Sequence, residues 1–154
     1  MTWINRISLA ATLLTALVCL LGSPTVLPAP SAEASAASPD AIVKRINSVR
    51  RARHLPIVRT SPSLRRSAHR YASDMVRGGY FAHLRRIRAS GRFNYLGEVL
   101  ARASRPPTAA WTVRAWMRSP THRAVLTNRR YRWVGIGRRG GSRGNMVVGH
   151  FGAR

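Results

Sequence analysis

The stretch AWMRSPTHRAVLTNRRYRWVGIG, residues 115–137, passes from a helical pattern to a strand pattern within one short segment. Trp116 ends a helical run that Ser119-Pro120 interrupts. Ser119 can cap a further short turn that holds His122, because a serine hydroxyl accepts from the free backbone N–H groups at a helix start. The stretch therefore predicts a helix, a capped turn that carries His122 and a strand that begins near Tyr131.

The remaining elements follow from the same kinds of pattern. The turn-rich segment GGSRGN, residues 140–145, separates two apolar segments and predicts a C-terminal β-hairpin. Upstream, one amphipathic helix is expected after a Ser38 cap, and a second is expected to end at Gly78-Gly79. NYLGEVLAR, residues 94–102, predicts a short strand or an extended segment. Helices followed by a hairpin predict an α+β fold in which helices pack on a small antiparallel sheet.

Residues 1–36 have the layout of a secretory signal peptide with its processing region. The apolar run Ile7–Leu21 is shorter than the roughly 20 apolar residues of a membrane-spanning helix, so an uncleaved anchor is the less favoured interpretation. Small residues predict cleavage near residues 34–36. We therefore expect a secreted protein, extracellular or associated with the cell wall. Because the only cysteine, Cys19, lies in this segment, the mature chain must fold without disulfides.

The charge of the chain is strongly unbalanced, with 27 Lys and Arg residues against 4 Asp and Glu residues and a formal net charge of +23. Such a surface favours polyanions, such as anionic envelope polymers or nucleic acid. A compositional bias toward Arg and Ala is the alternative interpretation. Aromatic residues are not interleaved with the arginines as a nucleic-acid groove would require, so no specific nucleic-acid partner is predicted.

Glu98 is the candidate for acid-base chemistry, because it is the only carboxylate in the central and C-terminal part of the chain and lies in an apolar stretch. It is either a structural carboxylate that binds backbone amides or arginines, or a general base or histidine partner. Nucleophilic catalysis has no support from the sequence. No cysteine remains after processing, and no Gly-x-Ser-x-Gly motif is present.

Five histidines are candidates for metal binding or proton transfer. His54 and His69 have the context of surface residues, and His150 alternates with apolar residues on one strand face, which favours a packed histidine. His83 and His122 remain, but their separation along the chain forms no recognisable metal motif. Spacing alone therefore predicts no zinc site.

Four blocks in register carry a resemblance to a known family. They are YASDMVRGGYFAH (71–83), LGEVLAR (96–102), the opening stretch at 115–137 and the terminal FGAR (151–154). Together they resemble the bacterial branch of the CAP superfamily, the secreted cysteine-rich secretory protein, antigen 5 and pathogenesis-related 1 domains, also called SCP-like. The resemblance assigns residues 41–154 to the CAP domain and leaves residues 37–40 as a short tether.

The resemblance implies an α-β-α sandwich with a small central antiparallel sheet and a cleft between its layers. His83, Glu98 and His122 match the family residues that converge in this cleft, and Ser119 lies near the place of a further acid found in eukaryotic members. Some members bind a zinc-type metal through the two histidines, and others bind sterols or fatty acids in a separate groove.

This chain departs from the family pattern at Val99 and Val125, where asparagine is common. Two histidines and one acid are few ligands for a metal site, since structural zinc sites use four protein ligands and catalytic ones three. No cofactor is therefore expected to be required, and His83 and His122 are candidate ligands of a weakly held zinc or other divalent cation.

Three hypotheses of function follow from these features. The first is a secreted, monomeric, non-catalytic binding module for a lipid, a small molecule or an anionic envelope polymer. The second is a metal-dependent hydrolase with Glu98 as base. The third is a polycationic protein that binds anionic envelope polymers or nucleic acid through its charge.

Overall fold

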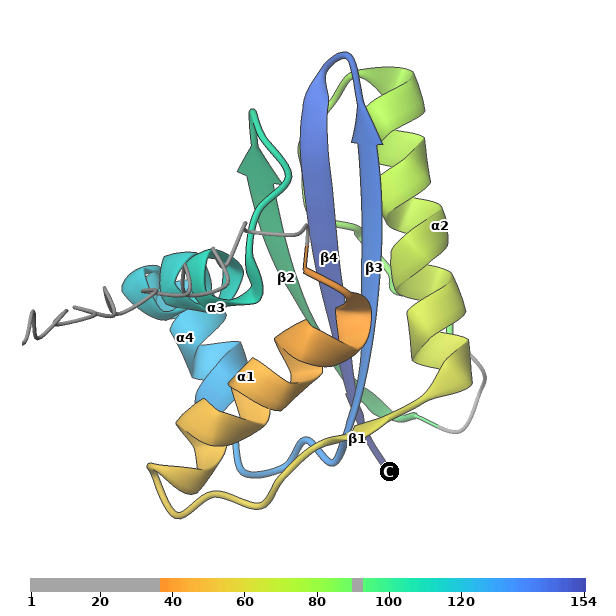
Figure 1. The fold of residues 1–154 in the computed structure, drawn as a ribbon. Coiled ribbons are helices and arrows are strands. Elements are labelled where there is room, and N and C mark those ends of the chain that lie inside the picture. Colours follow the sequence, from red (N-terminus) through yellow and green to blue (C-terminus); the bar gives the residue numbers. More distant parts are fainter. Residues whose placement is uncertain (1–36, 90–92) are drawn as a thin grey trace, which may run out of the picture. The chain divides into compact units, whose positions relative to one another are not determined.

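The computed structural model describes residues 37–89 and 93–154, so the signal peptide expected over residues 1–36, with its cleavage site, lies outside the described residues. Within them, four helices and four strands follow one another in the order shown in Figure 1. None of these helices is both long and apolar enough to cross a membrane. The elements are α1 (Pro39–Arg51), β1 (Arg59–Thr60), α2 (Pro62–Gly78), β2 (Tyr95–Ala103), α3 (Ala109–Arg118), α4 (Pro120–Thr127), β3 (Trp133–Gly141) and β4 (Gly144–Ala153).

The helices begin close to where the capping residues predict. The Ser38 hydroxyl accepts the backbone N–H of Ala41 at 3.1 Å at the start of α1. Pro39 and Asp40 are the first two residues of α1, as the Ser38 cap predicts, so they belong to this helix and not to the tether expected over residues 37–40. Ser119 precedes α4 as its N-cap residue, but its hydroxyl makes no capping bond, and the expected short turn is a helix of 8 residues.

The sheet is mixed, with strand order β1-β3-β4-β2. The pairs β2–β4 and β3–β4 are antiparallel, as predicted, whereas β1 pairs with β3 in parallel, from Arg59 beside Trp133 to Thr60 beside Val134. The expectation of a purely antiparallel sheet is therefore corrected by one short strand. A strand of two residues has no periodicity, so the sequence did not reveal it.

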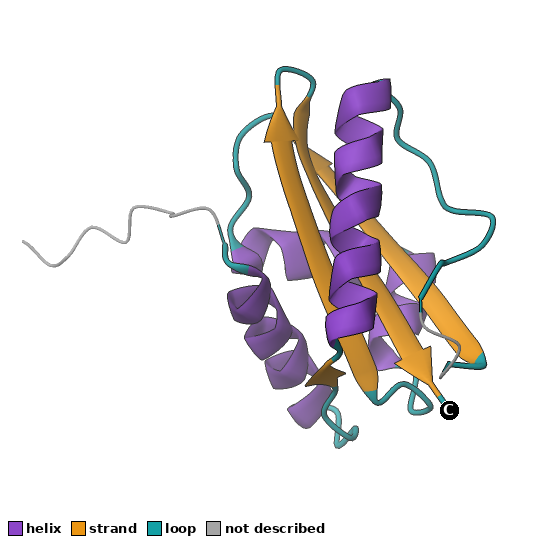
Figure 2. Ribbon diagram, turned by 90° about the vertical axis from the view of Figure 1, so that its right-hand side faces the viewer, coloured by secondary structure: helices purple, strands orange, loops and turns teal. Residues whose placement is uncertain are grey.

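Helices cover both faces of the sheet, which confirms the α+β class and the α-β-α sandwich (Figures 1 and 2). On one face α2 packs its apolar stripe against β2 and β4, with Met75, Leu100 and Val148 among the buried residues. On the other face α1, α3 and α4 enclose the larger core, which contains Ile46 and Trp116.

A buried arginine fixes the end of α4, the helix that carries His122. Arg50 of α1 is 0% exposed, and its guanidinium donates only to backbone carbonyls among its hydrogen bonds. Burial, followed by the nearby charge of Arg132, lowers the pKa of Arg50. Carbonyl oxygens thus replace the water that the guanidinium loses. The acceptors are Pro56, Leu126, Asn128 and Tyr131.

Two glycines of β3 allow α2 to lie directly on the sheet. A Cβ atom at Gly137 would lie 2.1 Å from the backbone N of His69 and 2.2 Å from the carbonyl carbon of Ala68. A Cβ atom at Gly135 would lie 2.0 Å from the backbone N of Arg65. Because the helix backbone cannot yield as a side chain can, these positions set the distance between α2 and the sheet.

We predict that Gly137→Ala lowers the free energy of unfolding by about 1–3 kcal/mol, because the added methyl group overpacks the contact between α2 and β3. Gly140→Ala in the same strand is the matched control, since its Cβ atom would meet the Asn145 side chain, nearest at Oδ1, 2.8 Å away. Urea unfolding followed by circular dichroism measures both variants. Equal stability of the two would show that α2 is not in tight contact with β3.

Candidate functional site

Strand pairing brings Glu98 and His150 together. Glu98 of β2 lies directly beside His150 of β4 in the antiparallel register. Leu100, two residues after Glu98, is buried against α2, so the Glu98 side chain points to the same side of the sheet. Glu98 has only 6% of its side chain exposed and His150 has none. A carboxylate and an imidazole are thus held together in the interior.

The Glu98 carboxylate accepts three hydrogen bonds. Its Oε1 atom accepts from Nδ1 of His83 at 2.7 Å and from the backbone N–H of Leu84 at 3.0 Å. Its Oε2 atom accepts from Nε2 of His150 at 3.0 Å. The segment that follows α2 is therefore attached to the sheet through one carboxylate.

These hydrogen bonds keep Glu98 ionised. Burial, the largest single influence, raises the pKa of Glu98, but the hydrogen bonds from His150, Leu84 and His83 together outweigh it and hold the pKa below its usual value. The geometry makes Glu98 both a structural carboxylate that accepts a backbone amide and the hydrogen-bond partner of two histidines, and it disfavours a general base. A general base needs an accessible lone pair and a pKa near the working pH, and this carboxylate offers neither.

Tyr71 of α2 also holds the segment that follows α2. Its hydroxyl donates to the backbone carbonyl of Ala82, the residue before His83. Burial, followed by the charge of Glu98, raises the pKa of Tyr71 to about 12, so the hydroxyl remains a neutral donor at physiological pH. The Tyr71 ring also stacks on His150, with ring centroids 6.5 Å apart. His83 is thus positioned by two independent contacts, its own bond to Glu98 and that of Ala82 to Tyr71.

The structure brings His122 to His83, as the resemblance implied. The ring centroids of the two histidines are 5.5 Å apart, with ring planes inclined by 47°. The His83 side chain is 57% exposed, whereas Nε2 of His122 is buried and has no hydrogen-bond partner within the described residues. Burial, followed by the charge of His83, lowers the pKa of His122, and Glu98 opposes the shift only in part.

Ser119, the fourth residue expected at the cleft, uses its hydroxyl elsewhere. Its Oγ atom shares a hydrogen bond of 3.1 Å with Oγ1 of Thr121, and it terminates α3 while preceding α4. Ser119 therefore shapes the start of the helix that carries His122. Within the described part of the chain, its hydroxyl makes no hydrogen bond to His83 or Glu98.

The donor set fits at most a weakly held metal ion. Within residues 37–89 and 93–154, no group of three or more His, Cys, Asp or Glu side chains is arranged to hold one. Two imidazoles remain, from His83 and His122. The bond from Nδ1 of His83 to Glu98 leaves its Nε2 atom for a ligand, which is the usual state of a metal-binding histidine. The partnerless Nε2 atom of His122 is the second donor.

His150 has a larger part in the site than its sequence context indicated. It packs on the expected strand face, but its Nδ1 atom also lies 3.1 Å from the Ser67 hydroxyl oxygen. Ser67, His150 and Glu98 therefore form a continuous hydrogen-bonded chain from α2 through β4 to β2. No signal in the sequence could identify this chain, because it depends on the register of β2 beside β4. His54 and His69 are exposed, as predicted.

Comparison with known proteins agrees with this architecture. The sequence profile of the cysteine-rich secretory protein family, CAP, matches residues 43–151. No curated protein matches the sequence significantly. Three similar solved structures have identities too low to show more than the fold.

An outer surface protein from Borrelia burgdorferi has a TM-score of 0.66 and 22% identity over 75% of this chain and 91% of its own. An extracellular protein with an SCP domain from Bacillus anthracis has a TM-score of 0.63 and 19% identity, over 75% of this chain and 40% of its own. The venom allergen-like protein 4 of Schistosoma mansoni has a TM-score of 0.57 and 15% identity, over 73% of this chain and 83% of its own.

We predict that Glu98→Gln destabilises the fold at neutral pH by about 1–3 kcal/mol, because a neutral amide cannot replace a carboxylate that accepts three hydrogen bonds. The folded-state pKa of Glu98 lies below its unfolded value of 4.5. Its contribution is therefore complete above that value and is lost as the pH falls through the folded-state pKa. Urea unfolding at about pH 7 and about pH 3.5 measures the effect.

Asp40→Asn is the matched control for this measurement, because Asp40 is an exposed acid whose nearest cation, Arg65, lies 3.7 Å away. We expect little change in its stability at either pH. A Glu98→Gln variant as stable as the native chain at neutral pH would contradict the assigned role of the carboxylate.

Proposed function

Because the chain belongs to the cysteine-rich secretory protein family, CAP, we propose that it is an extracellular binding module whose cluster of His83, Glu98 and His122 holds a divalent cation weakly. The expected signal peptide supports an extracellular location, as do the descriptions of similar structures from Borrelia and Bacillus as outer-surface and extracellular proteins. The molecule bound at the cluster would be a lipid, a small molecule or a component of the cell envelope.

One observation carries the metal proposal, the pairing of an oriented imidazole with a partnerless one. Glu98 holds His83 by its Nδ1 atom, and the buried Nε2 atom of His122 lies without a partner within the described residues. A buried nitrogen without a partner costs free energy in the folded state. A cation shared by the two rings would remove that cost. Binding would thus stabilise the fold as well as provide a Lewis-acidic contact for an oxygen of the ligand.

The cation is expected to bind weakly and only above acidic pH. Two protein ligands fall short of the three that catalytic zinc sites use, so water or ligand oxygens must complete the coordination. Imidazole binds metal only in its neutral form. The lowered pKa of His122 keeps this ring neutral at pH 7, and protonation at lower pH releases the metal.

The metal-dependent hydrolase with Glu98 as base receives less support. Glu98 is the acceptor in its hydrogen bonds with His83, Leu84 and His150, and its lowered pKa reduces its basicity. A base in this position would have to release a histidine or the Leu84 amide before it could take a proton.

We predict that zinc binds the native protein with micromolar or weaker affinity at about pH 7.5 and that binding is lost at about pH 5.5. At about pH 7.5, His122→Ala removes binding, whereas His69→Ala, which changes an exposed histidine of α2, retains it. Isothermal titration calorimetry measures the three proteins. Saturable binding by the His122→Ala variant, or no binding by the native protein at either pH, would contradict the proposed metal site.

A second candidate function, ester hydrolysis, is favoured by the Ser67–His150–Glu98 chain. In the tautomer of His150 that carries its proton on Nε2, this N–H donates a hydrogen bond to Glu98. The Nδ1 atom of His150 is then free to accept the hydroxyl proton of Ser67. Ser67 also lines a cavity of about 250 Å³ together with Tyr71 and Tyr80. A hydroxyl, an imidazole and a carboxylate in this order form the activating arrangement of serine hydrolases. Against it, Ser67 lies within a helix and not at an exposed turn.

If this second function holds, the native protein hydrolyses a short aryl ester at least about a hundredfold faster than Ser67→Ala does. Ser73→Ala, on the same helix, is the matched control and should be unaffected. A chromogenic acetate ester provides the assay. Equal rates for the native protein and Ser67→Ala would mean that the hydrogen bonds linking Ser67, His150 and Glu98 have only a structural role, whatever the outcome of the zinc titration.

A further inference from the structure

A groove bordered by α2, β3 and the start of α1 has a lining that is half arginine. The groove has a volume of about 820 Å³, and five of its ten lining residues are arginines. In the whole chain, Lys and Arg together account for 27 of 154 residues, about one in six. The general composition alone would therefore place one or two cations here. The arginines are Arg65, Arg66, Arg70, Arg77 and Arg138.

The helix arranges these cations along a line. Four residues of an α-helix rise about 6 Å, so Arg66 and Arg70 succeed one another on one side of α2, and Arg65 and Arg77 lie about 18 Å apart along the axis. Arg138 of β3 adds a cation from the sheet side. The charges thus follow a track suited to an extended ligand.

Nearby acids neutralise only part of this charge. Asp40 lies 3.7 Å from Arg65, and Asp74 pairs with Arg77. Arg66 and Arg70, one helical turn apart on α2, form no ion pair within the described residues. Two guanidinium groups therefore remain for an external anion, and each can bind a phosphate oxygen pair in a bidentate manner.

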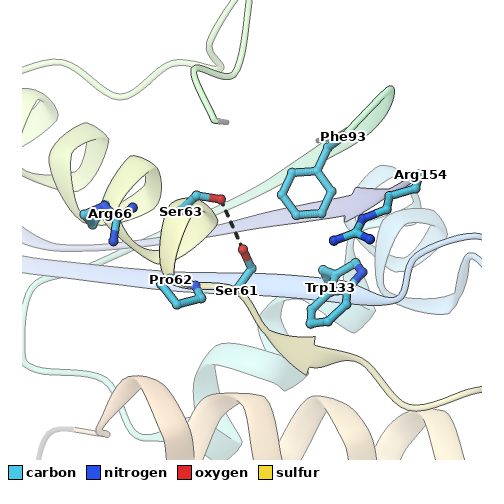
Figure 3. Close-up of a pocket in the computed structure, with 7 residues that line it drawn as sticks. All are labelled: Ser61, Pro62, Ser63, Arg66, Phe93, Trp133 and Arg154. Carbon is cyan, nitrogen blue, oxygen red and sulfur yellow. Dashed lines mark hydrogen bonds between the residues drawn. The ribbon is translucent and has the colours of Figure 1, made fainter. Parts of the chain in front are cut away.

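The basic surface continues beyond the start of α2. A second pocket, of about 370 Å³, shares Pro62 and Arg66 with the groove. Figure 3 shows Arg66 on one side of it and, on the other, the Arg154 guanidinium beside the rings of Phe93 and Trp133. The guanidinium carbon of Arg154 lies 5.8 Å from the centre of the Trp133 ring. A ligand that follows the groove would meet another cation here.

We propose that the α2 groove binds a linear phosphodiester polymer with non-aromatic repeats, such as a polyol phosphate, with Arg66 and Arg70 as its central contacts. A repeat of poly(glycerol phosphate) contains six backbone bonds and spans about 7 Å when the polymer is extended. This length is close to the rise of about 6 Å between Arg66 and Arg70 on the helix. The groove offers no Phe, Tyr or Trp ring for stacked bases, since Phe93 and Trp133 line only the adjoining pocket and lie against Arg154. The imidazole of His69 is the one aromatic ring in its lining, so a nucleic-acid strand would find little of the base stacking that usually stabilises such complexes.

This site is separate from the histidine cluster. None of the residues that line the groove belongs to the set His83, Glu98 and His122. The polymer site and the metal site can therefore be present or absent independently. His122→Ala should leave polymer binding unchanged.

The test measures binding of a fluorescently labelled poly(glycerol phosphate) of about ten repeats to the full chain between about 50 and 300 mM salt. The double variant Arg66→Gln/Arg70→Gln is compared with Arg45→Gln/Arg118→Gln, which removes the same charge from exposed positions on α1 and α3. We expect the groove variant to bind at least tenfold more weakly at about 0.1 M salt, with a salt slope smaller by about 1.4, the value for two lost phosphate contacts. The control variant should bind within about twofold of the native protein.

Two results would overturn the proposal. Equal weakening by both double variants would mean that net charge alone attracts the polymer. Tighter binding of an oligothymidylate with the same number of phosphates would assign the groove to nucleic acid. Circular dichroism of each variant verifies that the fold is retained, so a loss of binding reports on the groove itself.

Discussion

The buried Glu98 carboxylate is the constraint around which the candidate site is built. An ionised group with 6% exposure is tolerated in a protein interior only when hydrogen bonds replace its water. His83, the Leu84 amide and His150 meet this need from two separate parts of the chain. One electrostatic requirement thus connects the edge strand β2, the central strand β4 and the segment after α2, and it sets the orientation of two histidines.

The same requirement divides the histidines into two kinds. His150 is enclosed between the sheet and α2, and it can reach its Ser67 partner because Gly135, its neighbour in β3, leaves room for the helix backbone. His83 and His122 lie beside the edge strand β2. The His83 ring is exposed, and among the described residues Nε2 of His122 has no hydrogen-bond partner. A histidine whose bonds are all made stabilises the fold, whereas an unpaired one is available to a ligand. The strand edge is therefore where we propose that a cation binds.

The arginines of the core and those of the α2 surface have different roles. The core places one arginine, Arg50, among backbone carbonyls, where its charge serves the packing of α1 against α4. On α2 the arginines point outward into a groove that has few acids to neutralise them. Thus one residue type acts as a structural donor inside and as a candidate anion contact outside, and burial decides which.

The sequence by itself determined the helix start at Ser38, the hairpin, the sandwich fold, and the resemblance that brings His83, Glu98 and His122 together. These features depend on local caps, turns and periodicity, or on motifs whose order along the chain resembles that of a known family. Only the tertiary structure decided the register of β2 beside β4, the parallel pairing of β1, the Ser67–His150–Glu98 chain and the arginine groove. Each of these joins residues distant in sequence, and such contacts arise from packing and cross-strand hydrogen bonds that no local pattern records.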